Sequence, residues 1–238
     1  MIQRGWLVLL LLTLSGCNDE KVGHPYFPLH EGAVWQYQVQ EQLADQFNER
    51  TFSVQNLGSA ELKGEFEGES VSIRKTSDGT DYYLLQDDSG IYRIARRTVI
   101  EYRPRFEEEL VRVLPNEADL DVGRSWSVMT KPYALHNTPS YTVRSPREHK
   151  ISMAFEIVSL NETVTVPAGQ FENCIKVEGI ALLPLYTDPK TGYQDIEIRQ
   201  TEWYAPGVGL VKLVRDEPLE TDIFKGGVIS FELTNYEM

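Results

Sequence analysis

Cys17 is the residue of this 238-residue chain whose surroundings point most clearly to covalent chemistry. It ends a Leu-Ser-Gly-Cys sequence at residues 14–17, directly after an apolar run over residues 6–14, and Arg4 lies before that run. A basic start, a short apolar segment and small residues before a cleavage site are the three parts of a secretory signal. Removal of residues 1–16 would leave the Cys17 thiol beside the new N-terminus.

The sequence at residues 14–17 resembles the lipobox of bacterial lipoproteins. This resemblance implies that the sulfur of Cys17 is linked to diacylglycerol, often with a further acyl chain such as palmitate. Two or more acyl chains anchor a protein stably, because each buried CH₂ contributes about 0.8 kcal/mol. The alternative, a transmembrane helix, needs about 20 apolar residues. Here the apolar run stops at Gly16, so a lipid anchor is the better interpretation.

The residues after Cys17 bear on which membrane holds the anchor. In lipoproteins of bacteria with two membranes, aspartate directly after the cysteine is the usual signal for retention in the inner membrane. This chain has Asn18 there and Asp19 one position later. The resemblance therefore favours a cell-envelope location at the outer membrane, facing the periplasm. A host with one membrane would carry the domain on the outer face of that membrane.

The acidic composition limits the partners that the chain can bind. The formal net charge is -13, and removal of the signal takes away one more positive charge, that of Arg4. Nucleic-acid binding needs clustered Lys and Arg to contact phosphates. The arginines between 93 and 105 alternate with glutamates between 101 and 109, which is typical of a solvated face. We expect no nucleic-acid partner; anionic lipid headgroups are the alternative partner for those arginines.

The remaining titratable residues lack the spacing of a metal or catalytic site. The sequence contains no His-x-His, no nucleophile elbow, no phosphate loop and no dinucleotide motif. Cys174 has no cysteine partner once Cys17 is acylated, so we interpret it as a buried thiol. We expect no enzyme activity, no metal and no cofactor, and we expect the histidines to lie at the surface. These histidines are His24, His30, His136 and His149.

Alternation of apolar and polar residues with a period of two dominates the chain, and this pattern predicts β-strands. Gly-rich and Asp-rich breaks separate the strands, and the Asp78-Gly79 pair suits a hairpin turn. The only helical candidate, 40–49, is mostly polar. The expected strands cover 34–40, 51–55, 70–74, 81–85, 90–96, 125–130, 151–160, 163–166, 172–180, 193–204, 208–215 and 228–236.

This spacing of strands predicts an all-β fold: a strongly curved antiparallel sheet, or a half-open barrel or sandwich, with at most one short helix. Residues 17–25 are interpreted as a lipidated tether, and 26–238 as one β-rich domain. The alternative is a boundary between two subdomains near residues 104–120. Residues 131–150 form a long connection with aromatic side chains, and this connection could fold over an opening of the sheet.

One pattern occurs twice in the chain. Residues 29–35 and 120–126 share the sequence Leu-x-x-Gly-x-x-Trp, and each copy leads into a predicted strand. A glycine turn followed by a strand whose Trp packs on the core explains both copies. Two similar halves would produce this repeat, and so would chance similarity between two strand starts.

Three turn and core motifs resemble those of a group of uncharacterised bacterial envelope lipoproteins. They are Pro-Leu-x-x-Gly-x-x-Trp at 28–35, Pro-Ala-Gly-x-Phe at 167–171 and Trp-Tyr-Ala-Pro-Gly-Val-Gly at 203–209. The resemblance implies a curved antiparallel fold and brings no known activity. Such sheets look like those of the periplasmic lipoprotein carrier and its outer-membrane receptor, which hold acyl chains in half-open barrels. That likeness concerns the fold and not the function.

The aromatic strands without a catalytic grouping suggest a non-enzymatic, lipid-anchored envelope protein. Its curved sheet would bind a lipid, a peptide or a protein, and its anchor would hold it to the membrane. The alternative is a structural or assembly subunit of an envelope complex. We expect the apolar face of the sheet to include Val39, Ile73 and Ile94. The aromatic residues expected in the core or lining a cavity are Trp35, Tyr37, Trp126, Trp203 and Tyr204.

Overall fold

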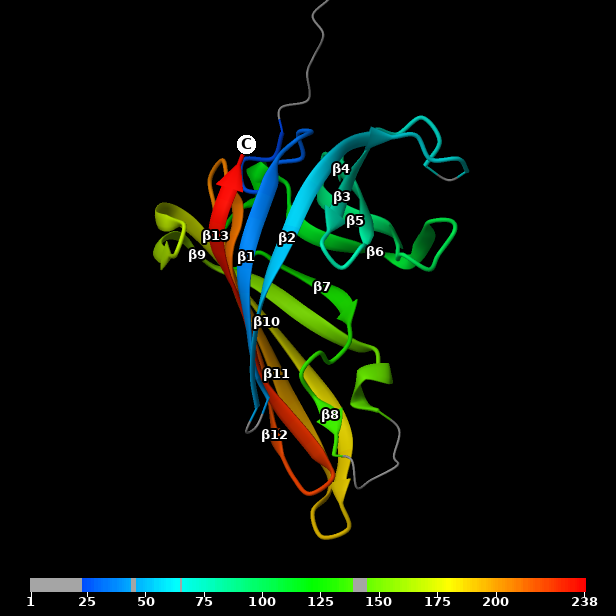
Figure 1. Ribbon diagram of the computed structural model, residues 1–238, viewed down its shortest axis with the longest axis vertical. Helices are drawn as coiled ribbons and strands as arrows, with labels where there is room; N and C mark the ends of the chain where they lie inside the picture. Colours follow the sequence, from blue (N-terminus) through cyan, green and yellow to red (C-terminus); the bar gives the residue numbers. More distant parts are fainter. Residues whose placement is uncertain (1–22, 44–45, 65, 139–144) are drawn as a thin grey trace, which may run out of the picture.

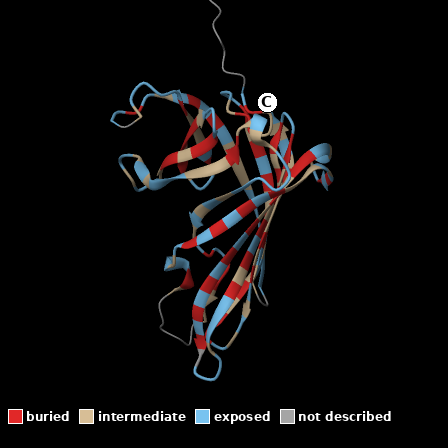
Figure 2. Ribbon diagram, turned by 180° about the vertical axis from the view of Figure 1, so that it is seen from behind, coloured by how far each residue is buried: buried red, intermediate tan, exposed pale blue. Residues whose placement is uncertain are grey.

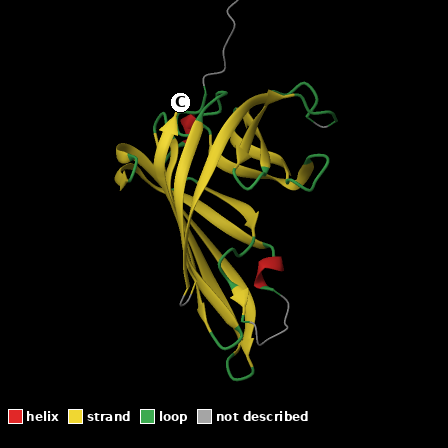
Figure 3. Cartoon of the chain, in the orientation of Figure 1, coloured by secondary structure: helices red, strands yellow, loops and turns green. Residues whose placement is uncertain are grey.

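The computed structural model describes residues 23–43, 46–64, 66–138 and 145–238. Its elements follow one another as β1 (Val34–Leu43), β2 (Gln46–Ala60), β3 (Val71–Thr76), β4 (Asp81–Asp87), β5 (Gly90–Arg97), β6 (Arg105–Pro115), η1 (Glu117–Asp119), β7 (Ser125–Thr130), β8 (His136–Asn137), η2 (Pro146–Glu148), β9 (Ile151–Val166), β10 (Gly169–Asp188), β11 (Gly192–Ala205), β12 (Gly209–Glu220) and β13 (Phe224–Glu237). Strands make up 68% of the described residues, and η1 and η2 are single 3₁₀ turns, so the all-β prediction is confirmed (Figure 3).

All the strands belong to one antiparallel sheet. Its order is β6-β5-β4-β3-β2-β1-β13-β12-β11-β10-β9-β7, with the short β8 added to β13. Each strand therefore pairs mainly with its neighbours in sequence, and the pairing of β1 with β13 joins the two ends of the chain. The sheet is curved into a nearly closed barrel shape, and β6 and β7 are its two free edges (Figure 1). This agrees with the predicted strongly curved antiparallel sheet or half-open barrel.

Burial along the strands follows the predicted alternation most clearly in β9. Its first seven residues, 151–157, alternate strictly between buried and exposed (Figure 2). The predicted strands 151–160 and 163–166 are one continuous strand in the structure, because the polar residues between them keep the hydrogen-bond pairing with β10. The polar segment 40–49, the helical candidate, instead lies in β1 and β2, apart from residues 44–45, which fall outside the described residues.

The strand β6 was not predicted, and the reason is its charge. Its Arg-Phe-Glu-Glu-Glu start is mostly exposed and shows weak alternation. Pairing with β5 supplies the missing stabilisation, including an ion pair between Arg93 and Glu107 at 2.8 Å. The region 104–120 therefore contains an edge strand and the start of the connection from β6 to β7, which links the two free edges of the sheet.

Bulges bend the long strand β10. Its pairing with β9 shifts register three times between Phe171 and Val177. Asn173, inside this region, has a φ of 55°, which is the left-handed conformation that asparagine tolerates better than most residues. Bulges increase local twist and bend a strand. The β9–β10 hairpin consequently curls away from the rest of the sheet (Figure 1).

The apolar residues form three clusters rather than one. The largest packs β9, β10 and β11 against β4 to β6, and it contains Met153 and Leu114. A second surrounds Trp35 and Val39 on the central strand β1. The third, with Ile94 fully buried, lies on β3, β4 and β5 and is joined by side chains from the β2–β3 connection. Both faces of this part of the sheet are therefore covered.

The N-terminal segment joins the fold earlier than residue 26. His24 is 3% exposed, and its Nε2 lies 3.0 Å from the carbonyl oxygen of Pro115. The amide of Gly207 donates to the carbonyl of Pro25 at 2.7 Å. The expectation of a surface position was therefore wrong for His24, because its ring fills a space against the end of β6. The signal 1–16 and Cys17 lie outside the described residues, as do residues 18–22 of the expected tether.

Candidate functional site

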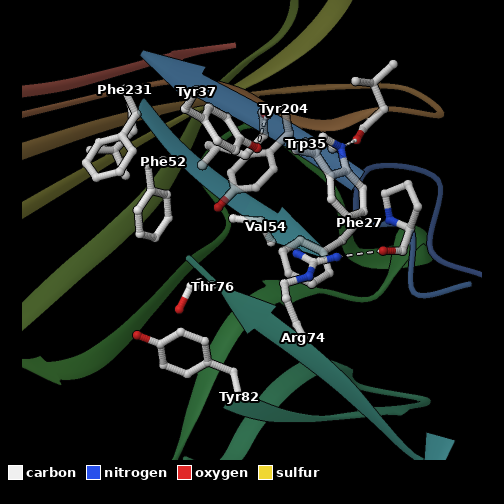
Figure 4. Close-up of a pocket in the computed structure, with 15 residues that line it drawn as sticks. Phe27, Trp35, Tyr37, Phe52, Val54, Arg74, Thr76, Tyr82, Tyr204 and Phe231 are labelled. Atoms are coloured by element: carbon white, nitrogen blue, oxygen red, sulfur yellow. Dashed lines mark hydrogen bonds between the residues drawn. The ribbon is translucent and has the colours of Figure 1, made fainter. Parts of the chain in front are cut away.

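An aromatic pocket of about 190 Å³ lies on the concave face of the sheet. It is lined by the consecutive strands from β4 to β11 in the strand order, because the curvature brings β3 and β4 opposite β11 to β13 (Figure 1). We call it the aromatic pocket, and its rings come from β1, β2, β4, β11 and β13 and from the segment before β1 (Figure 4). The rings on the strands are Trp35, Tyr37, Phe52, Tyr82, Tyr204 and Phe231.

Trp35 and Tyr37 are fixed by hydrogen bonds to the far side of the pocket. The indole Nε1 of Trp35 donates to the carbonyl of Val208 at 2.7 Å, and the hydroxyl of Tyr37 donates to the carbonyl of Leu210 at 2.9 Å. Residues 35 and 37 alternate with exposed Gln36, so the strand period places both rings on one face. The Ala-Pro-Gly turn before β12 presents the carbonyl that Trp35 needs. The pocket wall is therefore a rigid one.

Phe231 forms an edge-to-face aromatic pair with each of two neighbours. Its ring centroid lies 5.6 Å from that of Phe52 at 88° and 6.4 Å from that of Tyr37 at 72°. Such edge-to-face contacts contribute about 0.5–1.5 kcal/mol beyond the burial of area. Phe231, Phe52 and Tyr37 thus line the pocket as one group of aromatic rings in mutual contact.

The five aromatic residues expected in the core or a cavity fall into two groups. Trp35, Tyr37 and Tyr204 line the aromatic pocket. Trp203 follows the strand period to the opposite face, where Lys176 and Lys212 approach its ring. Trp126 lies on the edge strand β7 and stacks on Phe155 with the ring centroids 5.8 Å apart.

Arg74 is a pocket residue that the sequence analysis did not select. Strand periodicity places it on the face opposite Ile73, and the expectation assigned the pocket face to Ile73. The structure shows the reverse: Arg74 lines the pocket, and Ile73 packs with Ile94 in the cluster on the other face. The shared face expected for Val39, Ile73 and Ile94 was therefore wrong. The β2–β3 connection covers that other face, so apolar residues are favoured there too.

The guanidinium of Arg74 lies among rings and carbonyls. It lies 4.0 Å from the ring centroid of Phe27 and 4.8 Å from that of Trp35. Its Nη2 donates to the carbonyl of Pro28 at 2.7 Å, and its Nε donates to Oδ1 of Asn56 at 2.9 Å (Figure 4). Burial among these groups lowers the pKa of Arg74 to about 10, so the side chain remains a cation at neutral pH.

A second space of about 510 Å³ adjoins the aromatic pocket. Leu213 and Phe231 line both spaces, and Pro132 and Tyr133 of the long connection line the second one. We call it the wide pocket. Its charged side chains are Glu41, Arg50, Arg147 and Arg215. The nearby part of the 131–150 connection packs on the sheet, as its fully buried Leu135 shows.

Buried polar side chains at a spacing of two connect the floors of the two pockets. On β11, Gln200 Nε2 and the Tyr204 hydroxyl each donate to Glu202 at 2.5 Å. On β12, Arg215 donates from Nη1 to Gln200 at 2.8 Å and from Nε to Glu217 at 2.6 Å. Burial raises the pKa of Glu202, although the donors from Tyr204 and Gln200 oppose this shift. The sequence signal for this network was polar residues at inward strand positions.

Glu217 connects this network to the long connection. Its carboxylate accepts the backbone N–H groups of Tyr133, Ala134 and Leu135 at 2.8–2.9 Å. The guanidinium of Arg215 also lies 4.2 Å from the ring centroid of Tyr133. The connection is therefore attached over the concave face by a buried charge pair.

In the part of the chain that the structure describes, we found neither a metal-binding cluster nor a reactive cysteine. Among the described residues, no group of three or more His, Cys, Asp and Glu side chains could hold a metal ion. Cys174 is fully buried, and burial raises the pKa of its thiol to about 11, which disfavours the reactive thiolate. Within the same residues, no helix is long and apolar enough to span a bilayer.

The sequence profile of the DUF3108-like family matches residues 135–217 of this chain, less than half of its length. A search of curated proteins found no match.

Three solved structures are similar to this chain. One is a protein provisionally classed as a lipoprotein from Parabacteroides distasonis, at 16% identity, with 90% of this chain and 99% of that chain covered and a TM-score of 0.45. A provisionally assigned exported protein with a YmcC-like fold from Bacteroides fragilis has 15% identity, coverage of 90% and 100%, and a TM-score of 0.40. A provisionally assigned outer-membrane lipoprotein-sorting domain from Vibrio parahaemolyticus has 9% identity, coverage of 87% and 85%, and a TM-score of 0.30.

Proposed function

We propose that this protein is a lipid-anchored, non-enzymatic protein of the bacterial envelope that binds an apolar or amphipathic ligand in its aromatic pocket. The observation that carries the proposal is the pocket itself. Its rings are held in place by the Trp35 and Tyr37 hydrogen bonds, and it opens toward the wide pocket at Leu213. Concave sites lined by apolar and aromatic side chains, with few polar groups, are typical of small-molecule binding.

A neutral fluorescent probe tests the pocket. The chain from Asn18 onward retains every described residue, and it should bind N-phenyl-1-naphthylamine with increased emission. Val54 lines the pocket, so Val54→Trp should fill it and weaken binding at least tenfold. Val228 is 37% exposed and lines neither pocket, so Val228→Trp is the matched control and should bind like the wild type. Equal binding by both variants would contradict the proposal.

The anchor and its membrane belong to the same proposal. Cys17 after Leu-Ser-Gly supports acylation, and the absence of aspartate at position 18 supports the outer membrane, facing the periplasm. Cells labelled with an alkyne-tagged fatty acid should give a labelled wild-type protein and an unlabelled Cys17→Ala variant. Fractionation should place the wild type with outer-membrane markers. Label on the Cys17→Ala variant would contradict acylation at this cysteine.

The free edges of the sheet favour a second candidate, a subunit of an envelope assembly. Among the described residues, neither β6 nor β7 has a hydrogen-bonded strand on its outer side. Leu110 on β6 is 46% exposed and Met129 on β7 is 43% exposed. Unpaired edges accept strands from partners. A photo-crosslinker placed at Leu110 or Met129 should then capture one envelope protein in living cells, and Val54→Trp should leave that capture unchanged.

A further inference from the structure

Arg74 carries a positive charge that no described carboxylate neutralises. Its hydrogen-bond partners are the carbonyl of Pro28 and the amide of Asn56, which are both uncharged. Two other buried or partly buried arginines pair with carboxylates: Arg93 pairs with Glu107, and Arg215 pairs with Glu217. A cation in an apolar site favours an anion, because water no longer screens it.

The partners of Arg74 also leave donors unused. A guanidinium has five N–H groups. One goes from Nε to Asn56 and one from Nη2 to Pro28, so three remain. The side-chain amide of Asn56 is itself fixed, because its Nδ2 donates to the carbonyls of Pro28 and His30, each at 3.1 Å. Arg74 is thus held in place with unused donors on a wall of the pocket.

Tyr82 lies on the same face as Arg74 but directs its hydroxyl elsewhere. The two residues are direct partners in the pairing of β3 with β4, and both line the aromatic pocket. Figure 4 shows the hydroxyl of Tyr82 pointing away from the Arg74 guanidinium, on the side of Thr76. The guanidinium, beside the rings of Phe27 and Trp35, is therefore the group of this wall that is placed to meet an anion.

We propose that the aromatic pocket binds a monocarboxylate with one apolar chain, and that its carboxylate contacts Arg74. This inference rests on the proposed function, because it names the ligand class for the same pocket. A single negative charge balances the single unpaired guanidinium, whereas a phosphate monoester carries about -1.5 to -2. The planar fork of arginine also matches a carboxylate geometrically.

The size of the site suits a chain that extends beyond the aromatic pocket. Benzene fills an engineered cavity of about 150 Å³. A pocket of about 190 Å³ therefore holds the carboxylate and the first carbons. The rest of the chain passes Leu213 and Phe231 into the wide pocket. The carboxylate belongs at the Arg74 end, because Arg50 and Arg215 of the wide pocket are already paired with glutamates and Arg147 is exposed to solvent.

Decanoate and decanol, two probes with the same chain, test the inference by calorimetry on the chain from Asn18 onward. The wild type should bind decanoate at least tenfold more tightly than decanol. Arg74→Met keeps an apolar side chain over the Phe27 ring and removes the charge, so it should weaken decanoate binding roughly 10- to 100-fold and change decanol binding less than threefold. Arg105→Met is the matched control, since its side chain is 58% exposed, and it should bind both probes like the wild type.

Arg74→Lys keeps the test decisive if Arg74→Met fails to fold. It keeps the charge and loses the planar fork that matches a carboxylate, so it should weaken decanoate binding roughly 3- to 10-fold without affecting decanol. Equal affinities for decanoate and decanol, unchanged in both Arg74 variants, would overturn the carboxylate site and leave the apolar pocket standing. Failure of the wild type to bind either probe would overturn the carboxylate inference. Failure to bind N-phenyl-1-naphthylamine as well would remove the proposed function.

Discussion

The two halves of this sheet begin alike and differ in what surrounds them. Strands β1 to β6 form the first half, and β7 with β9 to β13 form the second. In the first half, Gly32 donates to the carbonyl of Asn56 at 3.0 Å, and the Asn56 amide donates back to Ala33 at 2.9 Å. In the second, Gly123 donates to Ile157 at 2.8 Å, and Ile157 donates back to Arg124 at 3.0 Å.

The repeated tryptophans have different environments despite this shared geometry. Trp35 leads a strand that has neighbours on both sides, β2 and β13, and it is 2% exposed. Trp126 leads β7, which pairs with β9 alone, and it is only partly buried. The same local motif thus produces a pocket wall in one half and an edge residue in the other. The position of a strand in the sheet decides the role of its side chains.

The largest expected difference between the two halves is the loss of stability on replacement of each motif tryptophan by alanine. Trp35→Ala deletes a buried ring and leaves the carbonyl of Val208 without its donor, so it should lower the free energy of unfolding by about 4–5 kcal/mol. Trp126→Ala deletes an edge ring and should lower it by about 2 kcal/mol. Urea denaturation of both variants measures the difference. Equal losses would mean that the edge strand β7 is packed as tightly as β1.

The second-largest expected difference in stability concerns one buried and one exposed charge pair, one in each half. Glu217→Gln leaves Arg215 buried without a counter-ion, so it should lower the free energy of unfolding by about 3–4 kcal/mol. In the first half, the cations that pair with Asp81 are exposed, with Lys75 at 49% and Arg97 at 41%, and water can solvate them.

Asp81→Asn is the comparison variant for Glu217→Gln, and it should cost about 1 kcal/mol. Denaturation in low and high salt measures both variants, and salt should reduce the effect of Asp81→Asn more than that of Glu217→Gln. A similar response of both to salt would contradict the difference in burial on which this prediction depends.

The glycines of the two Leu-x-x-Gly-x-x-Trp copies provide a matched test of whether the two turns are equivalent. Gly32 has a φ of +89° and Gly123 a φ of +90°, and a Cβ at either position would meet no atom within 4 Å. Alanine should therefore cost only its backbone strain, about 1–2 kcal/mol in each case. Thermal unfolding of Gly32→Ala and Gly123→Ala should give equal losses within error. Unequal losses would show that the two turns differ in strength.

The smallest expected effect is an opposite dependence of stability on pH. Glu202, in the second half, has a folded pKa raised above 4.5 by burial. As pH rises, this carboxyl group loses its proton in the unfolded chain before it does so in the folded protein. The free energy of unfolding therefore falls as pH rises from the unfolded pKa to the folded pKa. Asp78, in the first half, is partly buried, but hydrogen bonds from Thr76 and Thr80 outweigh burial and lower its pKa below 3.8. Its contribution is present above the unfolded pKa and is lost as pH falls through the folded value.

Denaturation of Glu202→Gln and Asp78→Asn at pH 4 and pH 7 tests this sign. Relative to the wild type, Glu202→Gln should gain stability as pH rises, and Asp78→Asn should lose it. A shared direction for the two variants would contradict the assigned shifts.

Much of the fold followed from local pattern, and the failures have physical causes. Alternation identified most strands, because burial on one face selects apolar residues at every second position. The edge strand β6 was not predicted, because its first residues are charged and its pairing with β5 stabilises it instead. Arg74 was not predicted as a pocket residue, because apolar side chains cover both faces of β3. Alternation alone therefore could not tell which face lines the pocket.

The sequence by itself determined the antiparallel strands, their turns, the repeated strand start and the predicted acylation signal at Cys17, because each depends on neighbouring residues. Only the tertiary structure decided that Trp35, Tyr37 and Tyr204 meet Arg74 around one pocket. That meeting depends on the pairing of β1 with β13, and contacts such as Trp35 to Val208 join residues 173 positions apart. Curvature and register across so many strands are set by packing between distant segments, which no local pattern records.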